Sequence, residues 1–342
     1  MRYIEAMESR TVTVVGAGII GSSIARRLAM AGQRVRLIEA GEPGKGATNA
    51  AAGMLAPGGE FETDSRCLRL ALRSMELYPA WIRDLQEETG LNIDFRIGGA
   101  LQYPEAETSS LAERCERQKN LGIPCEMRGE TAFYPGDGAV NPRDIFTALI
   151  TSCRRLGVEV LEQQPAVCAS DADGPVVIAA GARSGEIPAF SNGRRLSLPR
   201  TVPVKGHLIG YSLAPGSLPH ILRRGHTYLV QRADGYTIAG GTSQEIGFDE
   251  TLDADQCASI RRRAELLWPE LRRHEPCDAW SGLRPMPETG EPAIGRVENT
   301  DVWLAYGHYR NGILLAPATA EKIADDILAA SISRDPASLE TD

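Results

Sequence analysis

Three glycines near the start of the chain have the spacing of a phosphate-binding turn. Gly16, Gly18 and Gly21 form a G-x-G-x-x-G motif, which alone is weak evidence in a chain with 35 glycines among 342 residues. Here the motif directly follows an apolar run at 11–15, which predicts a strand, and opens a predicted helix over 20–31. In that context, backbone N–H groups and the positive end of the helix face a pyrophosphate. The sequence therefore predicts a dinucleotide site.

An acidic residue follows the glycine motif at a suitable distance. Glu39 ends the next predicted strand, over 35–39, and lies 18 residues after Gly21. A carboxylate at this point can accept hydrogen bonds from ribose hydroxyls and disfavours the 2′-phosphate of NADP. This βαβ unit does not by itself separate NAD from FAD.

Two further segments favour FAD. Residues 46–57 are rich in glycine and alanine, which suits backbone packed closely against a ligand. Near the end of the chain, a predicted strand over 302–307 leads through GHYRNGILLAP into a predicted helix over about 313–330. We expect this second helix, which begins near Gly312, to point its positive end at the flavin pyrimidine and stabilise the anionic reduced ring.

The remaining periodicity predicts two kinds of structure. Helical spacing covers residues 67–89, 258–272 and 141–156, the last with Asn141 as N-cap and Gly157 as the stop. Extended segments are expected over 92–103, 158–162, 176–182 and 200–245, the last with a hairpin turn at Asp234-Gly235. The predicted fold is an α/β, Rossmann-like FAD-binding domain with a second α+β domain built on an antiparallel sheet.

The length of 342 residues is enough for two domains. We expect a discontinuous FAD-binding domain over 8–90, 140–199 and 281–334, and a substrate-binding domain over 91–139 and 200–280. Residues 1–7 and 335–342 are predicted to be flexible ends.

Composition argues against several classes of function. The net charge is −8 and the basic residues are dispersed, which disfavours nucleic acid as a partner. No apolar stretch is long enough for a membrane helix and the first residues do not read as a leader, so a cytoplasmic protein is expected. Seven cysteines without a C-x-x-C pair predict scattered thiols rather than disulfides, and no metal-ligand spacing occurs.

Taken together, the motifs resemble those of the D-amino-acid oxidase superfamily and, within it, the bacterial glycine oxidases of the thiamine pathway. The resemblance spans nearly the whole chain. It rests on VVGAGIIG with Glu39, ATNAAAGMLAP, AAGARS, PVKG, TYLVQR followed by IAGGT, SGLRP and GHYRNGILLAP. It implies FAD as cofactor, and a discontinuous FAD-binding domain beside an antiparallel substrate domain, in agreement with the pattern above.

The resemblance also assigns roles to individual side chains. Arg284 in SGLRP is similar to the arginine that pairs with the substrate carboxylate, and Tyr228 in TYLVQR to its hydroxyl partner. A planar guanidinium binds a carboxylate through two hydrogen bonds, which fixes the substrate Cα over the flavin. Arg310 resembles a second active-site arginine near the flavin, and Met54 and Glu60 match positions that line the entrance.

A larger set of residues is expected to contact the cofactor. By resemblance and by motif, these are Gly16, Gly18, Ile19, Ile20, Gly21, Glu39, Ala40, Thr48, Ala51, Ala52, Gly53, Met54, Val167, Gly181, Arg284, His308, Arg310, Asn311, Gly312, Ile313 and Leu314.

No His/Asp pair or carboxylate dyad falls within these motifs, so the sequence offers no general base of the usual kind. The resemblance implies that none is needed. Glycine or another small amino acid would bind with a neutral amine, and a hydride would pass from Cα to flavin N5. The imine would be hydrolysed or passed to thiazole synthesis, and O2 would be reduced to H2O2. A homo-oligomer is also implied.

Four features depart from the family pattern. Arg183 replaces a usual tryptophan, and His207 stands where the family often has glutamine. Ser243 occupies a substrate-pocket position where related glycine oxidases carry a larger apolar residue, a change that could admit a larger side chain. Residues 164–177 are short for the strand meander that the family places there.

Other functions remain open at this point. Within the oxidoreductases, the alternatives are a D-amino-acid or sarcosine oxidase and a D-amino-acid dehydrogenase that reduces a quinone. A flavin-dependent tRNA-modifying protein is disfavoured by the lack of a basic face. An FAD-binding protein with a purely structural role would have little reason to keep Arg284, Tyr228 and Arg310 in their motifs.

Overall fold

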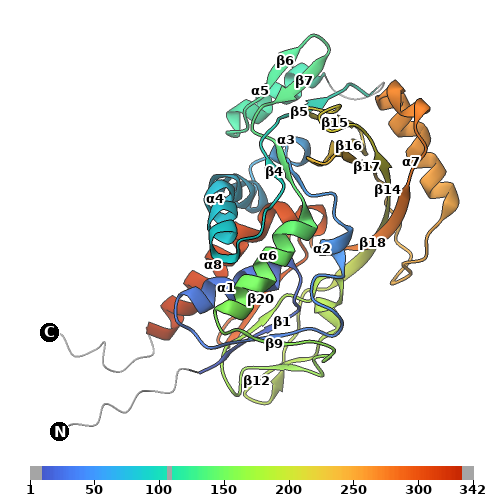
Figure 1. Cartoon of the computed structure of the whole chain (residues 1–342). Helices are drawn as coiled ribbons and strands as arrows, with labels where there is room; N and C mark the ends of the chain where they lie inside the picture. Colours follow the sequence, from blue (N-terminus) through green and yellow to red (C-terminus); the bar gives the residue numbers. More distant parts are fainter. Residues whose placement is uncertain (1–9, 106–109, 333–342) are drawn as a thin grey trace, which may run out of the picture.

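Two sheets, one mainly parallel and one mainly antiparallel, organise the chain (Figure 1). The computed structural model describes residues 10–105 and 110–332, so the predicted flexible ends at 1–7 and 335–342 lie outside the described residues. In Figure 1, helices α1, α4, α6 and α8 gather around the first sheet, and α7 covers the outer side of the second.

The first sheet has six strands in the order β19-β20-β11-β1-β2-β9. All neighbouring pairs are parallel except β19 with β20. The strands are β1 (Val12–Val15), β2 (Val35–Ile38), β9 (Glu159–Leu161), β11 (Val176–Ile178), β19 (Ala293–Arg296) and β20 (Val302–Tyr306). The chain leaves β1 toward β2 on one side, while β11 lies on the other. The strand order thus reverses beside β1, and ligands of open α/β sheets bind at such a point.

The second sheet has eight strands in the order β18-β14-β17-β16-β15-β5-β7-β6. Its pairs are antiparallel except β15 with β5. The strands are β5 (Ala100–Gln102), β6 (Glu126–Arg128), β7 (Thr131–Tyr134), β14 (Thr201–Ser212), β15 (Ile221–Arg224), β16 (Thr227–Gln231), β17 (Tyr236–Gly240) and β18 (Asp278–Pro287). This is the antiparallel sheet that the sequence predicts.

Two three-stranded sheets complete the strands of the described residues. One has the order β3-β8-β4, and the other β10-β12-β13. The strands are β3 (Met54–Leu55), β4 (Phe95–Arg96), β8 (Gly138–Val140), β10 (Ala169–Ser170), β12 (Ala189–Ser191) and β13 (Arg194–Arg195). The first of these sheets anchors one end of the glycine- and alanine-rich segment at 46–57.

The helices differ widely in length. The α-helices are α1 (Ile19–Met30), α2 (Ala47–Ala50), α3 (Pro57–Glu60), α4 (Arg66–Thr89), α5 (Leu111–Asn120), α6 (Pro142–Arg155), α7 (Ala254–Leu267) and α8 (Gly312–Ile332). Short 3-10 helices are η1 (Gly181–Glu186), η2 (Pro269–Arg273) and η3 (Tyr309–Asn311). No helix in the described part of the chain is long and apolar enough to cross a membrane.

The largest hydrophobic core lies between the first sheet and helices α1, α4, α6 and α8. Ile24 and Leu28 on one face of α1 have no exposed surface, as their helical spacing predicts. Burial of one such side chain contributes about 1.5–3 kcal/mol. Tyr78 of α4 donates a hydrogen bond of 2.5 Å from its hydroxyl to the carbonyl oxygen of Ile313. This bond fixes the first turn of α8 against the core.

Most predicted elements form, but several details differ. Asn141 caps α6 by accepting from the N–H of Arg143, as predicted. The helix predicted at 258–272 begins earlier, at Ala254, because Asp253 accepts from two backbone N–H groups and caps it. The strand predicted over 176–182 ends at Ile178, and Gly181 (φ +58°) then opens a 3-10 turn. The predicted domain boundaries stay predictions, and the structure places all of β18 in the second sheet.

The prediction that all cysteines are free thiols is wrong. Cys115 in α5 and Cys125 before β6 form a disulfide, with their Cα atoms 5.5 Å apart. The turn that reverses the chain between these residues brings the two thiols together, and a separation of ten residues carries no recognisable signal. Five described cysteines are free. Among the described residues, no group of three or more potential ligands could hold a metal ion.

Candidate active site

A single cavity of about 1460 Å³ extends from the end of β1 to the concave face of the second sheet. Its walls include residues of both sheets, the 46–57 segment and the start of α8. Typical small-ligand pockets measure about 300–1,000 Å³, so this cavity has room for a large ligand together with a small one.

The glycine motif forms one end of the cavity. Gly16 has φ +103°, and a Cβ atom there would lie 2.5 Å from the carbonyl oxygen of Ala179, directly after the neighbouring strand β11. A Cβ atom at Gly21 would lie 1.9 Å from the carbonyl oxygen of Gly16. Only glycine therefore allows the turn and the helix to pack this closely.

The N-terminus of α1 opens into this end of the cavity. The first backbone bond of the helix runs from Ser22 N to Gly18 O at 3.0 Å, so Ile20 and Gly21 lack a preceding carbonyl partner. Glu39 lies beside them, because its carboxylate accepts from Ala17 N at 2.8 Å and Gly41 N at 3.0 Å. Free N–H groups and a fixed carboxylate are the donor and acceptor set that a pyrophosphate and a ribose need.

The 46–57 segment forms a wall of the cavity because the second sheet holds its backbone. The buried guanidinium of Arg232 donates to Ala52 O at 2.6 Å and to Val140 O at 2.8 Å. Trp280 of β18 donates from its indole N–H to Ala50 O at 3.1 Å. Burial lowers the pKa of Arg232 to about 10, so this arginine keeps its charge at neutral pH.

Thr48 joins the same segment to the glycine motif. Its hydroxyl accepts from Ile19 N at 2.9 Å, so the side chain caps the first turn of α1 from outside the helix. Thr48 is buried and lies on the cavity wall. The 46–57 segment is thus fixed at both ends by specific hydrogen bonds, which suits a binding surface and not a linker.

The start of α8 forms the opposite part of the cavity. Gly312 and Ile313 line it, whereas Leu314 is buried in the hydrophobic core. His308 is 4 % exposed and lies 3.1 Å from the hydroxyl of Thr319 through Nε2. Burial lowers the pKa of His308 to about 4, which keeps the imidazole neutral.

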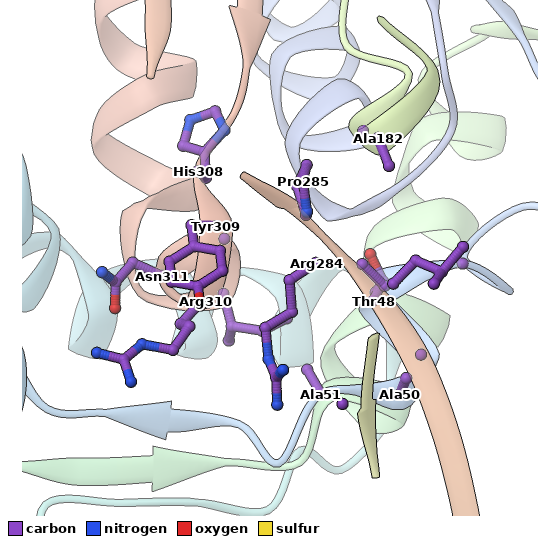
Figure 2. Close-up of a pocket in the computed structure, with 18 of the residues that line it drawn as sticks. Thr48, Ala50, Ala51, Ala182, Arg284, Pro285, His308, Tyr309, Arg310 and Asn311 are labelled. Carbon is purple, nitrogen blue, oxygen red and sulfur yellow. The ribbon is translucent and has the colours of Figure 1, made fainter. Parts of the chain in front are cut away.

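Arg284 extends into the cavity from β18 (Figure 2). Its Nη1 donates to Thr242 O at 2.8 Å, and no carboxylate pairs with it among the described residues. The guanidinium lies flat on Gly206, where a Cβ atom would come within 2.1 Å of Nη2. Since an arginine has five N–H donors, Arg284 keeps several available for a ligand.

Tyr228 lies beside Arg284 on the same face of the sheet. Its ring covers Gly240, where a Cβ atom would lie 2.4 Å from the phenolic oxygen. Burial raises the pKa of the Tyr228 hydroxyl, and the charges of Arg284 and Arg310 only partly offset this. The hydroxyl therefore stays protonated at neutral pH and can donate a hydrogen bond to an anion.

Arg310 in η3 extends into the same part of the pocket as Arg284 (Figure 2). Its Nη2 lies 2.9 Å from Oε2 of Glu60, so these two predicted site residues form an ion pair with each other. Met54 also lines the cavity. Because Glu60 already neutralises Arg310, Arg284 is the stronger anion ligand of the two.

The cavity brings together most of the residues predicted from the sequence. Its wall includes Gly16, Gly18, Ile19, Ile20, Glu39, Ala40, Thr48, Ala51, Ala52, Gly53, Met54, Glu60, Gly181, Tyr228, Ser243, Arg284, His308, Arg310, Asn311, Gly312 and Ile313. Gly21, Val167 and Leu314 are not part of the wall. Val167 is 87 % exposed, and Pro165 and Ala166 occupy the cavity wall beside it.

Several polar wall residues have no counterpart among the sequence predictions. They are Gln102, Arg114, Arg223, His226, Arg263 and Gln256. The strand register explains why Arg223 and Gln102 line the cavity. Arg223 pairs with both Gln102 and Tyr228, so the three residues share one face of the sheet. That register depends on pairing between distant strands, and the sequence of either strand alone contains no signal for it.

The glycine turn and an arginine with unused donors lie on the walls of one cavity, an arrangement that suits an oxidoreductase with a dinucleotide cofactor. Residues 11–326 match the family described as FAD dependent oxidoreductase (DAO), and the chain belongs to this family. It is an FAD-dependent oxidoreductase that is similar to glycine oxidases.

Relatives and solved structures agree on this assignment. A glycine oxidase of Pseudomonas aeruginosa is 35 % identical over 93 % of this chain and 94 % of its own. A bifunctional ThiO/ThiG protein of Trichormus variabilis is 32 % identical over 94 % of this chain but 53 % of its own. The crystal structure of glycine oxidase from Geobacillus kaustophilus has a TM-score of 0.86 at 30 % identity, covering 93 % of this chain and 94 % of that one.

The cavity fits FAD on its own geometry. The free N–H groups of Ile20 and Gly21 suit the pyrophosphate, and the carboxylate of Glu39 suits the ribose. The cavity then continues past the 46–57 segment to the first turn of α8. A ligand with two extended halves, such as FAD, can reach both helix N-termini at once.

Proposed function

We propose that the protein catalyses the oxidative deamination of glycine or another small amino acid. The observation that carries the proposal is Arg284, whose guanidinium has no carboxylate partner and lies on Gly206 beside the protonated hydroxyl of Tyr228. A planar guanidinium together with a neutral phenol suits a carboxylate better than any other small group.

The residues of this chain position the substrate. Arg284 and Tyr228 hold the carboxylate, which leaves the Cα atom and the amine directed toward the part of the cavity bounded by α8. FAD held by the glycine turn and Glu39 would supply the hydride-accepting chemistry and the reduction of O2 to H2O2. The imine product is then hydrolysed or passed to thiazole synthesis for thiamine. In this proposal positioning replaces a dedicated base, because the described residues of the cavity wall include no histidine paired with a carboxylate side chain.

Arg310 and Glu60 have a different role in this proposal. Their ion pair of 2.9 Å joins η3 to α3 across the cavity wall, with Arg310 41 % and Glu60 19 % exposed in their side chains. The pair holds the two segments together at the entrance and contributes little charge of its own. A homo-oligomeric state and a cytoplasmic location remain predictions from the sequence.

The test is a steady-state oxidase assay with the Arg284→Ala variant. Peroxide formation from glycine, sarcosine and D-alanine identifies the substrate class and separates an oxidase from a dehydrogenase that reduces a quinone. With the best of these substrates, Arg284→Ala is expected to raise KM on the order of 100-fold, because a charge-assisted hydrogen bond contributes about 1.5–3 kcal/mol. An unchanged KM removes Arg284 from the site.

A further inference from the structure

The cavity wall includes six arginines. Four of them form ion pairs with acidic residues: Arg114 with Glu62, Arg183 with Glu186, Arg223 with Asp137 and Arg310 with Glu60. The other two, Arg263 and Arg284, have no ion pair among the described residues. Arg284 has a role in the proposed function, and Arg263 does not.

Arg263 reaches the cavity from helix α7. Its Nη2 donates to Gly241 O at 3.0 Å and its Nε to Ser259 O at 3.4 Å, so both contacts are to backbone carbonyl oxygens. Burial lowers the pKa of the Arg263 guanidinium, and no acidic group offsets this. Because this arginine is partly desolvated and has no counterion, binding of an anion to it is favourable.

Arg263 and Arg284 are tied to neighbouring peptide units. Arg263 donates to Gly241 O, while Arg284 donates to Thr242 O, the next carbonyl along the chain. Consecutive carbonyl groups are close together, so the two guanidinium groups lie on the order of 10 Å apart. The same cavity touches both.

Other polar groups surround Arg263 in the cavity. Gln256 and Ser259 precede Arg263 by seven and four residues, so they lie on its side of α7, and both line the cavity. His226 lines it from β16's side, and its carbonyl oxygen accepts from Gly241 N at 3.1 Å. Glu250 also lines the cavity, but it is exposed and forms no ion pair with an arginine of the part of the chain that the structure describes. Solvent therefore screens Glu250, and Arg263 keeps its attraction for an anion.

We propose that Arg263 forms a second anion-binding subsite, and that the enzyme favours substrates with a second carboxylate. This inference deepens the proposed function and rests on it. One carboxylate lies on Arg284 and Tyr228, and the other extends past the Gly241–Thr242 segment to Arg263, with Gln256 and Ser259 beside it. Glycine fills only the part of the site at Arg284.

Shape-matched substrate pairs that differ in charge test the subsite. D-glutamate and D-glutamine have nearly the same shape and differ in charge, as do D-aspartate and D-asparagine. The measured quantity is the ratio of kcat/KM between the acid and its amide, which cancels general effects on folding or flavin content. We compare wild type, Arg263→Gln and Arg263→Lys with Arg262→Gln, because Arg262 is the adjacent exposed arginine on α7 and does not line the cavity.

The wild type and Arg262→Gln are expected to favour the acid by up to about fivefold, as a partly exposed ion pair allows. Arg263→Gln should bring the ratio close to one, and Arg263→Lys should keep most of it. Added salt should lower the wild-type ratio and leave that of Arg263→Gln unchanged. A ratio that is equal in wild type and Arg263→Gln, or that falls equally in Arg262→Gln, overturns the subsite.

A binding titration separates this inference from the proposed function. Succinate and its monoamide succinamate are titrated into the FAD-loaded enzyme and followed by the change in flavin absorbance. Tighter binding of succinate in wild type, lost in Arg263→Gln, supports the subsite even if no amino acid is oxidised. Equal binding of the two ligands in wild type overturns it even if glycine is a good substrate. If neither member of a substrate pair is oxidised, the titration decides.

Discussion

A single methyl group on the sheet beneath Arg284 should disable substrate binding. In Gly206→Ala, the new Cβ atom would lie 2.1 Å from Nη2 and 2.2 Å from Nη1 of Arg284. An ordinary contact begins at 3.4 Å, so the guanidinium must move by more than about 1 Å. It then loses its bond to Thr242 O and its alignment with the substrate carboxylate.

A displacement of about 1 Å at a positioning group can lower catalysis on the order of 100-fold. We expect Gly206→Ala to lower kcat/KM by roughly this factor, mainly through KM, because the carboxylate contact forms already in the ground state. The assay is peroxide formation with the best amino-acid substrate, accompanied by the flavin content and the thermal midpoint of each variant.

Gly210→Ala is the matched control on the same strand. A Cβ atom at Gly210 would lie 2.2 Å from the hydroxyl of Tyr236, which is an equally close approach to the end of a side chain. Tyr236 bonds to Asp278 and does not line the cavity. Gly210→Ala should therefore change kcat/KM less than about threefold. Full activity in Gly206→Ala, or an equal loss in both variants, would refute the reasoning.

Three other predictions concern stability and cofactor binding. Asp137→Ala leaves the buried charge of Arg223 unpaired and should lower the free energy of unfolding by about 3–5 kcal/mol in denaturant titrations. The double variant Asp137→Leu/Arg223→Leu removes both charges and should recover most of the lost stability. An equal loss of stability in the single and the double variant would contradict this prediction. His308 has its pKa lowered by burial from 6.5 to about 4, so the unfolded state binds the proton more readily. Neutral His308 therefore contributes about 3 kcal/mol to the free energy of unfolding above pH 6.5, and this contribution is lost as the pH falls toward 4. The free energy of unfolding of His308→Gln should depend less on pH between 6.5 and 4 than that of the wild type. Gly16→Ala places a Cβ atom 2.5 Å from Ala179 O at φ +103°, and the purified variant should lack flavin absorbance; stoichiometric flavin would exclude a tight turn as the reason for this glycine.

The cofactor half of the site could be predicted from the sequence because its signals are local. Gly16, Gly18 and Glu39 belong to one βαβ unit, and their spacing along the chain fixes their spacing in space. The start of α8 was predictable for the same reason, since only a short loop with η3 separates Gly312 from β20 of the same sheet.

The substrate half of the site depends on contacts between distant segments, which the sequence of one segment does not reveal. The ion pair between Arg310 and Glu60 joins positions 250 residues apart, and both residues were predicted without any sign that they meet. Arg263 lies on an amphipathic helix whose charged residues all read as solvent-exposed, and only the packing of α7 on the second sheet turns this one toward the cavity. Val167 shows the opposite case, because a loop of irregular backbone left that side chain in solvent.

Strand β18 places strict limits on how this sequence can vary. Trp280, Gly282 and Arg284 alternate along the strand and so lie on one face. Trp280 binds the backbone of Ala50, and a Cβ atom at Gly282 would lie 2.3 Å from the Cβ atom of Ala50. Insertion or deletion of one residue between Trp280 and Arg284 would turn the arginine to the opposite face of the sheet. Residues around this strand can therefore be substituted and its flanking loops can change in length. The number of residues from Trp280 to Arg284 must stay at five, because any other number would separate the cofactor wall from the carboxylate site.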